Sequence, residues 1–368
     1  MQAKQEKLLD LLGRPDARYV IPVYQRAYAW GPDQCDALWH DVLAAGSAGS
    51  THFVSTVLLA GPSGDAANEP AACEPSGALG GNPGELMVVD GQQRLVSVTL
   101  MLVALRDRLA RGDVALPFVD ADVIQETYLS PAGTRKLVLS RADDVTLESV
   151  VSDSALPQHP SARVQENLAS FREKMDAEDF DAETFWRGLR GLYVIAVDLD
   201  GDDAPQAIFE SFNSKGVPLV TADLCRNYLL LPLPHADQVR IYDEYWEPMM
   251  DLFGDDPGSL RFNNAILGWL TVRFRRIRAK GDKQAFAVFK RYCEEERKGS
   301  LEDMLREMRN FCMVWAENYR YHAVKKYKTA DWAVLGAKTL VSDYERKAPD
   351  NPEAYRFYVE HFNVAAHW

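Results

Sequence analysis

Five consecutive residues carry the sharpest chemical signal in the sequence, at a point where a predicted strand gives way to a predicted helix. The free N–H groups of a first helical turn favour negative charge, and a glycine there lets another group approach the backbone closely. Glutamine amides can orient a water or a phosphate oxygen, and a guanidinium offers a fork of donors that matches phosphate geometry. The pattern therefore predicts a phosphate-binding turn, the DGQQR turn, formed by Asp90, Gly91, Gln92, Gln93 and Arg94.

The same five residues also have a purely structural interpretation. Asp90 as a helix N-cap with Gln93 three residues later would form a capping box, which stabilises a helix start without binding anything. Strand-turn-helix junctions with glycine are common, so the spacing alone leaves both interpretations open.

A polar turn between two predicted helices, within residues 208–227, is a second candidate site. Asn213, Lys215 and the backbone amide of Gly216 would offer donors to an anion. The alternative is a structural helix-helix corner, because asparagine and glycine are natural helix-terminating residues.

Two acidic residues flank that turn. Glu210 and Asp223 could hold a divalent cation or position a water. Thr221 is a natural N-cap for the following helix, which again favours the structural alternative.

An aromatic segment near the N terminus, residues 18–30, is the third candidate. Aromatic rings interleaved with glutamine and arginine suit contact with a nucleic-acid base or phosphate, by stacking and bidentate hydrogen bonding. Clusters of tyrosine and tryptophan are more often core with an amphipathic rim. The residues concerned are Pro22, Val23, Tyr24, Gln25, Arg26, Tyr28 and Trp30.

The elements that position these residues can be read from hydrophobic patterning. Residues 52–60 and 85–89 are apolar and β-branched without a helical stripe, which predicts neighbouring strands. Residues 92–111 are apolar on most faces in their first half and predict a long helix buried under the sheet. In the aromatic segment, Pro22 predicts an edge strand that runs into a loop.

Weaker patterns complete the N-terminal half. The 24 residues of 61–84 include six glycines and four prolines, which predicts a long loop whose role as a lid stays open. Short helices are predicted over residues 4–12, over 33–43 with Asp33 as the N-cap, and over 163–175, with a strand over 192–199.

From residue 205 onward almost every stretch has helical periodicity. The simplest division is an α+β domain over residues 1–204 followed by an all-helical domain over 205–368. The length of 368 residues agrees with two domains, since single cores rarely grow beyond about 250–300 residues. Helices are predicted over 237–253, 259–278, 283–296, 301–321, 331–348 and 352–362.

The composition, 47% hydrophobic and 26% charged, excludes disordered, collagen-like and coiled-coil classes. A net charge of −13 argues against a nucleic-acid binder for the chain as a whole. Residues 261–330, however, hold 17 Lys and Arg against 8 Asp and Glu, a balance of +9 that leaves −22 elsewhere. Such a cluster suits DNA phosphates, or else a solvated helix face. Its densest run is Arg273, Arg275, Arg276, Arg278 and Lys280, and a second run is Lys325, Lys326 and Lys328.

The sequence also predicts the compartment. Charges near the start leave no apolar core for a signal peptide, and no run approaches the roughly 18 apolar residues of a membrane span. Five widely spaced cysteines without a Cys-x-x-Cys suggest neither a disulfide framework nor a thiolate zinc site. We therefore expect a cytoplasmic protein without membrane contact.

The order of these blocks along the chain resembles a known family. The Ile-Pro-Val-Tyr-Gln-Arg stretch, the 52–60 strand, the DGQQR turn and the 208–227 block are similar to the N-terminal, GmrS-like domain of GmrSD-type modification-dependent restriction endonucleases. The resemblance covers about residues 18–231. It implies a ParB/sulfiredoxin-like mixed core, an anti-phage restriction role, and NTP hydrolysis, of GTP or ATP with Mg²⁺, coupled to sensing of modified double-stranded DNA.

Matched position by position, the resemblance assigns roles to residues of this chain. It implies catalysis for Asp90, Gln92, Gln93 and Arg94, and nucleotide binding for Gly91, Asn213, Lys215 and Gly216. It implies sensing of the DNA modification for Pro22, Val23, Tyr24, Gln25 and Arg26. The chain looks most like the SspE-type effectors that recognise DNA phosphorothioate. A small apolar notch at Pro22 and Val23 would favour a sulfur, which is softer and less hydrated than oxygen.

One part of the family pattern has no counterpart here. Relatives carry a C-terminal HNH nuclease domain, which we expect in the full-length protein. The cluster of His361, Asn363 and His367 lacks the β-hairpin context of that nuclease and is interpreted as coincidental.

Three hypotheses follow from the residues and the resemblance: an NTPase sensor, a non-catalytic ParB-like DNA-binding module that uses nucleotide as a switch, and a direct nuclease acting through the DGQQR turn. The third ranks last because the turn has a single acidic residue. The metal ligands, the assembly state, the preferred nucleotide and the DNA mark stay open.

Overall fold

The computed structural model describes residues 2–61, 84–199, 219–254, 260–273 and 282–322. The chain divides into two compact units, an N-terminal unit of residues 1–213 with 234–236 and a C-terminal unit of residues 214–233 with 237–368. The predicted boundary between residues 204 and 205 lies outside the described residues. A mixed sheet with many helices confirms the α+β class.

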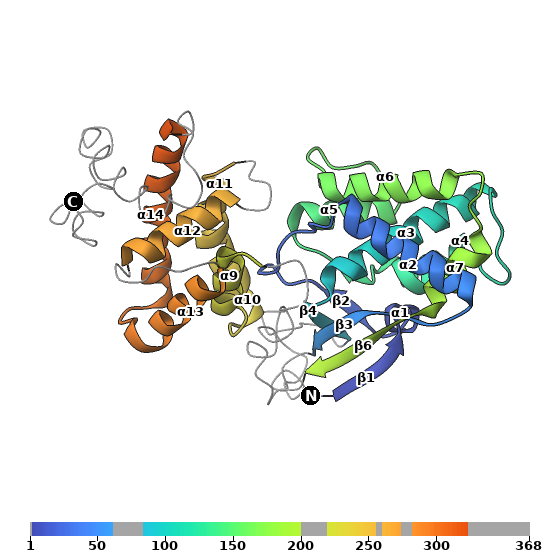
Figure 1. Cartoon of the computed structure of the whole chain (residues 1–368), viewed down its shortest axis with the longest axis horizontal. Coiled ribbons are helices and arrows are strands. Elements are labelled where there is room, and N and C mark those ends of the chain that lie inside the picture. The colour runs from blue at the N-terminus through green and yellow to red at the C-terminus, as the bar shows by residue number, and fades with distance from the viewer. Residues whose placement is uncertain (1, 62–83, 200–218, 255–259, 274–281, 323–368) are drawn as a thin grey trace. The chain divides into compact units, whose positions relative to one another are not determined.

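A six-stranded mixed sheet forms the base of the N-terminal unit, in the order β1-β6-β3-β4-β2-β5 (Figure 1). The β3–β4 and β1–β6 pairs are antiparallel, and the β6–β3, β4–β2 and β2–β5 pairs are parallel. The strands are β1 (Gln2–Lys7), β2 (Arg18–Val20), β3 (His52–Ala60), β4 (Glu85–Asp90), β5 (Leu137–Val138) and β6 (Leu192–Leu199). The predictions of β3, β4 and β6, and of β3 and β4 as neighbours, are confirmed.

Two predictions for the N-terminal residues are wrong. Gln2–Lys7 pair as an antiparallel strand with β6, so the helix predicted over residues 4–12 shrinks to α1 (Leu8–Leu12). Pairing with β6 satisfies backbone groups that a lone strand edge would leave open. Likewise β2 is not an edge strand, because it lies between β4 and β5. Pro22 falls two residues beyond the end of β2, where its missing N–H disturbs no ladder bond.

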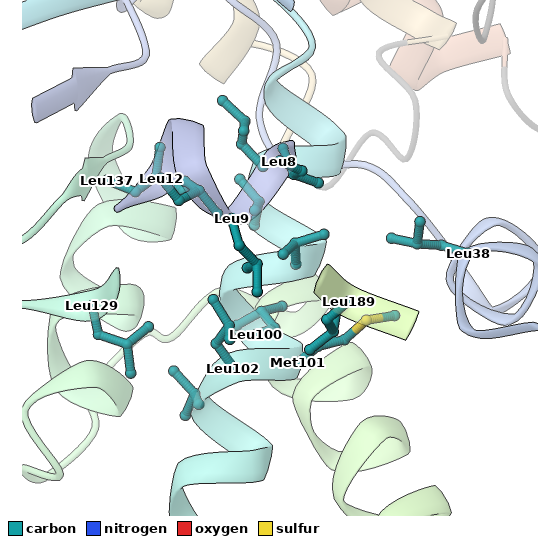
Figure 2. Close-up of a cluster of buried hydrophobic side chains, with 14 of the residues drawn as sticks. Leu8, Leu9, Leu12, Leu38, Leu100, Met101, Leu102, Leu129, Leu137 and Leu189 are labelled. Atoms are coloured by element: carbon teal, nitrogen blue, oxygen red, sulfur yellow. The ribbon is translucent and has the colours of Figure 1, made fainter. Parts of the chain in front are cut away.

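The long helix α3 (Gln92–Arg111) is confirmed, and it forms the centre of the hydrophobic core. Figure 2 shows Leu100, Met101 and Leu102 of this helix in one cluster of buried side chains with Leu9 of α1 and with Leu189. Each of the three is fully buried, and burial of one such side chain contributes about 1.5–3 kcal/mol. The core therefore fixes the position of α3, and with it the DGQQR turn at its start.

Helices α2 (Pro32–Ala48) and α7 (Ala182–Gly191) cross in backbone contact on the helical side of the sheet (Figure 1). A Cβ at Gly46 would lie 1.9 Å from the Thr184 carbonyl oxygen, and one at Gly188 would lie 1.9 Å from the Val42 carbonyl oxygen. Only glycine fits at both positions.

Helix α2 starts at Pro32 with Gly31 as its N-cap, so the prediction of Asp33 as N-cap is wrong.

Further helices cover the same side of the sheet. The helix predicted over 163–175 is confirmed, whereas three others were not predicted. The confirmed helix is α6 (Ala162–Asp176), and the unpredicted ones are α4 (Ala121–Ile124), α5 (Arg141–Val151) and α7.

The described part of the C-terminal unit is helical throughout. The helix predicted over 237–253 is interrupted by a π-helical turn, η5 (Tyr242–Trp246), and the helix predicted over 283–296 ends in one, η7 (Tyr292–Glu296). Those predicted over 331–348 and 352–362 lie outside the described residues. The helices are α9 (Thr221–Leu230), α10 (His235–Ile241), α11 (Glu247–Asp251), α12 (Leu260–Arg273), α13 (Asp282–Arg291) and α14 (Leu301–His322). Among the helices of the described residues, none is both long and apolar enough to cross a membrane.

Candidate functional site

The DGQQR turn lies where β4 ends and α3 begins. Gly91 adopts φ 97°, a left-handed conformation that side chains disfavour. A Cβ there would lie 3.1 Å from Val57 Cγ2 and 3.3 Å from the Thr56 carbonyl oxygen. Glycine is therefore required both by the backbone conformation and by the closeness of β3.

The capping-box interpretation of this turn is wrong. Gly91 is the N-cap residue, and no side chain caps the helix. Within the described residues, the backbone N–H groups of Gln92 and Gln93 donate to no other protein group. The positive end of a twenty-residue helix is thus left uncapped.

The two glutamine side chains bind the aromatic segment, an arrangement we call the glutamine clamp. Gln93 Oε1 accepts hydrogen bonds from the backbone N–H of Ala29 at 2.8 Å and of Trp30 at 3.1 Å. Gln93 Nε2 lies 3.4 Å from the Ala27 carbonyl oxygen, and Gln92 Nε2 donates to the Arg26 carbonyl oxygen at 3.2 Å. Both side chains are 7% exposed. The Gln93 side-chain oxygen and the Gln92 amide nitrogen are therefore already hydrogen-bonded to protein groups.

Other contacts hold the aromatic segment against the same elements. Gln25 Nε2 donates to the Val89 carbonyl oxygen of β4 at 2.8 Å. The Tyr28 hydroxyl lies 2.6 Å from Ser97 Oγ of α3, and Asn167 Nδ2 donates to that hydroxyl at 3.0 Å. The segment and the DGQQR turn therefore form one hydrogen-bonded unit.

Burial decides which members of the aromatic segment can meet a ligand. Tyr24, Tyr28 and Trp30 are at most 9% exposed, which confirms the core interpretation for these rings. Pro22 and Gln25 are also buried, whereas Val23 and Arg26 are half-buried. In this conformation Val23 and Arg26 are the sensing candidates with exposed surface.

Asp90 and Arg94 form the charged part of the turn. Burial raises the pKa of the Asp90 carboxyl above its ordinary value, and the Gly91 N–H and the charges of Arg94 and Arg26 oppose that rise. Burial lowers the pKa of the Arg94 guanidinium, which the Asp90 carboxylate opposes.

Arg94 is held by a ring rather than by hydrogen bonds. Its guanidinium carbon lies 5.6 Å from the centroid of Trp30, within range of a cation–π interaction. In the part of the chain that the structure describes, this guanidinium donates no hydrogen bond and forms no ion pair. All five of its N–H donors are therefore available to an anion.

Sequence comparison with known families decides the family. The family model described as the GmrSD restriction endonuclease, N-terminal domain, matches residues 8–230. This chain belongs to the GmrSD family. The family consists of restriction enzymes that act on DNA. No curated protein matches the chain.

The GmrSD match extends over the second candidate block, most of which cannot be placed. Glu210, Asn213, Lys215 and Gly216 lie outside the described residues. The predicted pairing of Glu210 with Asp223 therefore stays a prediction. Asp223 is described, and its carboxylate accepts a hydrogen bond from Arg226 at 2.9 Å.

The helix that follows this block is capped from elsewhere in the chain. Its N-cap is Val220, so the prediction of Thr221 as N-cap is wrong. Instead, Asp282 Oδ1 accepts from the Thr221 N–H at 2.8 Å and from its hydroxyl at 2.6 Å. The residues that the structure describes contain no group of three or more His, Cys, Asp or Glu that could hold a metal ion.

Of the predicted DNA-phosphate run, only Arg273 can be placed. Its guanidinium carbon lies 5.4 Å from the Tyr292 ring centroid, and its Nε lies 3.8 Å from Glu307 Oε1. Arg273 is thus engaged within the C-terminal unit. Arg275, Arg276, Arg278 and Lys280 lie outside the described residues, as do Lys325, Lys326 and Lys328 and the cluster of His361, Asn363 and His367.

Two further residues hold the aromatic segment by hydrogen bonds, and the sequence-based predictions include neither of them. Asn167 donates to Tyr28 and to the Trp30 carbonyl oxygen, and Asp143 Oδ2 accepts from the Tyr28 N–H at 2.6 Å. Asn167 is 1% exposed on the apolar face of α6. A polar residue on the buried face of an amphipathic helix is the signal that could have identified it.

Proposed function

We propose that this chain is the nucleotide-hydrolysing, modified-DNA-sensing part of a GmrSD restriction enzyme. The observation that carries the proposal is the DGQQR turn, an uncapped helix start beside a guanidinium whose donors are unused in the described structure. A nucleotide phosphate would use both the backbone N–H groups and the guanidinium.

Arg94 is the phosphate-binding residue of the proposed site. The Trp30 ring supports one side of the guanidinium and limits its motion. Partial burial keeps water away, so that its attraction for a phosphate is stronger than at an open surface.

Asp90 is the proposed catalytic carboxylate. Burial raises the pKa of its carboxyl, and the charges of Arg94 and Arg26 oppose that rise by favouring the ionised form. In the ionised form Asp90 would orient or deprotonate an attacking water. Magnesium sites on nucleotides commonly use one or two carboxylates together with phosphate oxygens, so a single Asp90 suffices as the protein ligand. When bound, Mg²⁺ would neutralise charge on the phosphates.

The glutamine clamp gives Gln92 and Gln93 a positioning role in this proposal. Their amides hold residues 26–30, so a displacement of the aromatic segment by DNA would change the surroundings of Asp90 and Arg94. Recognition of a modified backbone at Val23 and Arg26 would thereby alter hydrolysis. A phosphorothioate sulfur beside Pro22 and Val23 is the modification we propose.

Phosphate release tests the proposal. Each NTP is incubated with Mg²⁺ and with phosphorothioated, methylated or unmodified duplex DNA. We expect turnover that rises with one modification, and a loss of about 10²–10³-fold in Arg94→Gln because the transition-state charge loses its donor fork. Arg240→Gln, which removes an exposed arginine of the C-terminal unit, is the matched control and should retain activity. Equal turnover in Arg94→Gln and the parent chain would refute the nucleotide role of the turn.

A non-catalytic DNA-binding module with nucleotide as a switch is the second candidate. The observation that favours it is the glutamine clamp, because an amide that already holds Ala29 and Trp30 is not free to orient a water. Nucleotide that binds and is never hydrolysed, with any of the three DNAs, would establish this function instead.

A further inference from the structure

A surface pocket of about 550 Å³ lies in the N-terminal unit and shares no lining residue with the DGQQR turn. The end of β1, the turn that precedes β3, one face of α7 and a turn at residues 116–119 enclose it. Its volume falls within the range of sites that hold a small ligand or a single nucleotide. The argued side chains are Lys7, Phe118, Glu183, Trp186, Arg187 and Arg190.

The turn at residues 116–119 presents an aromatic ring at its tip. Leu116 and Val119 form an isolated β-bridge, Pro117 occupies the second position, and Phe118 the third with φ 63°. A proline-initiated turn with positive φ at its third position normally carries glycine or asparagine there. Phe118 instead accepts the steric cost and is 100% exposed. Folding gains nothing from that ring.

Three cations surround the other side of the pocket. Lys7, Arg187 and Arg190 are exposed, and in the described residues none of them forms an ion pair. Arg187 donates one hydrogen bond, to Thr184 Oγ1 at 2.9 Å. Glu183 is the one acidic residue of the described lining. On a chain of net charge −13 this local excess of positive charge points to an anionic ligand.

We propose that this pocket binds a nucleic-acid strand. Phe118 stacks on a base, while Lys7, Arg187 and Arg190 contact the adjacent phosphates. An exposed ring beside cations is the combination with which proteins bind single strands. A protein partner would need more apolar area, yet Trp186 is buried and Leu116 and Val119 are half-buried. The site requires that the chain contacts DNA, as its family does, and does not depend on NTP hydrolysis.

Replacement of the ring by the residue that the turn prefers tests the stacking contact. Phe118→Gly relieves the positive φ, so its melting temperature should equal or exceed that of the parent chain. Fluorescence anisotropy with a labelled single-stranded oligonucleotide and with a labelled duplex measures binding. We expect the affinity of Phe118→Gly for the single strand to fall about 5- to 150-fold. Phe53→Ala removes another exposed ring, one that does not line the pocket, and should bind as the parent does.

Salt dependence tests the phosphate contacts. The double variant Arg187→Gln with Arg190→Gln should reduce the slope of log affinity against log salt by about 1.4 on a single strand. Arg163→Gln, an exposed arginine paired with Glu166, should leave the slope unchanged. Unchanged affinity in Phe118→Gly together with an unchanged slope in the double variant would overturn the proposal. Basal phosphate release, measured in parallel, reports separately on the proposed nucleotide site.

Discussion

Replacement of Gln93 by leucine tests whether the glutamine clamp holds the aromatic segment in place. Leucine fills a similar volume but accepts no hydrogen bond, so the N–H groups of Ala29 and Trp30 lose their acceptor. The Trp30 bond is buried, and an unsatisfied buried donor costs about 1–3 kcal/mol. The partly buried Ala29 bond adds about 0.5–1.5 kcal/mol.

The expected loss in Gln93→Leu is therefore about 1.5–4.5 kcal/mol of unfolding free energy. Urea denaturation measures the global loss, and hydrogen exchange at the amides of Ala29 and Trp30 measures local opening. A local loss of about 2 kcal/mol corresponds to exchange that is about 30-fold faster.

Two variants serve as controls for this prediction. Gln93→Glu keeps an oxygen that can accept from both N–H groups and should restore much of the amide protection. Gln34→Leu removes an acceptor of the same type from an exposed bond, in which Gln34 Oε1 accepts from the Gly31 N–H at 2.9 Å, and should cost no more than about 0.5 kcal/mol. Unchanged amide protection in Gln93→Leu, with a stability loss no larger than that of Gln34→Leu, would refute the reasoning.

Three further predictions concern other parts of the N-terminal unit. Because burial raises the Asp90 pKa, the parent chain should gain stability relative to Asp90→Asn as the pH falls from 7 toward about 4, the ordinary pKa of an aspartate. Urea melts across this range with no difference in trend would contradict this, and turnover should fall about 10²–10⁴-fold in the variant. Gly188→Ala places a methyl group against the α2 backbone and should lower the unfolding free energy by about 1–3 kcal/mol or more. Gly31→Ala makes no contact closer than 3.6 Å, and in the same denaturation assay it should cost less, about 0.5–1 kcal/mol, because alanine is a poorer N-cap than glycine. Lys136→Met removes an ammonium that donates to three backbone carbonyl oxygens and should cost about 1–3 kcal/mol in a thermal or urea melt; full stability in this variant would show that water replaces those bonds.

The sequence by itself determined the elements whose pattern is local. The apolar content of residues 92–111, the β-branched strands on either side of residues 61–84 and the glycine at position 91 identified β3, β4, α3 and the turn between them. Each of these signals lies within a few residues of what it predicts, so no distant contact was needed to interpret it. The family resemblance rested on the same local blocks, and the family match confirmed it.

Only the tertiary structure decided how these elements use their side chains. Gln93 looked equally suited to cap its own helix, yet its partners lie 63 and 64 residues earlier in the chain. Residues 4–7 fall within the helix predicted over residues 4–12, yet they belong to a strand that completes the edge of the sheet beside β6. In both cases the competing partner is distant in sequence, and local spacing contains no information on it.

Distance along the sequence also explains why one candidate binding site could be predicted from the sequence and the other could not. The DGQQR turn is contiguous, so its residue types and their spacing are enough to identify it as a candidate. The pocket beside Phe118 is assembled from β1, a turn and α7, with about 180 residues between Lys7 and Arg187. A single cation or aromatic residue in the sequence does not predict a binding site. Only the packing of these elements brings the ring and the cations to one surface.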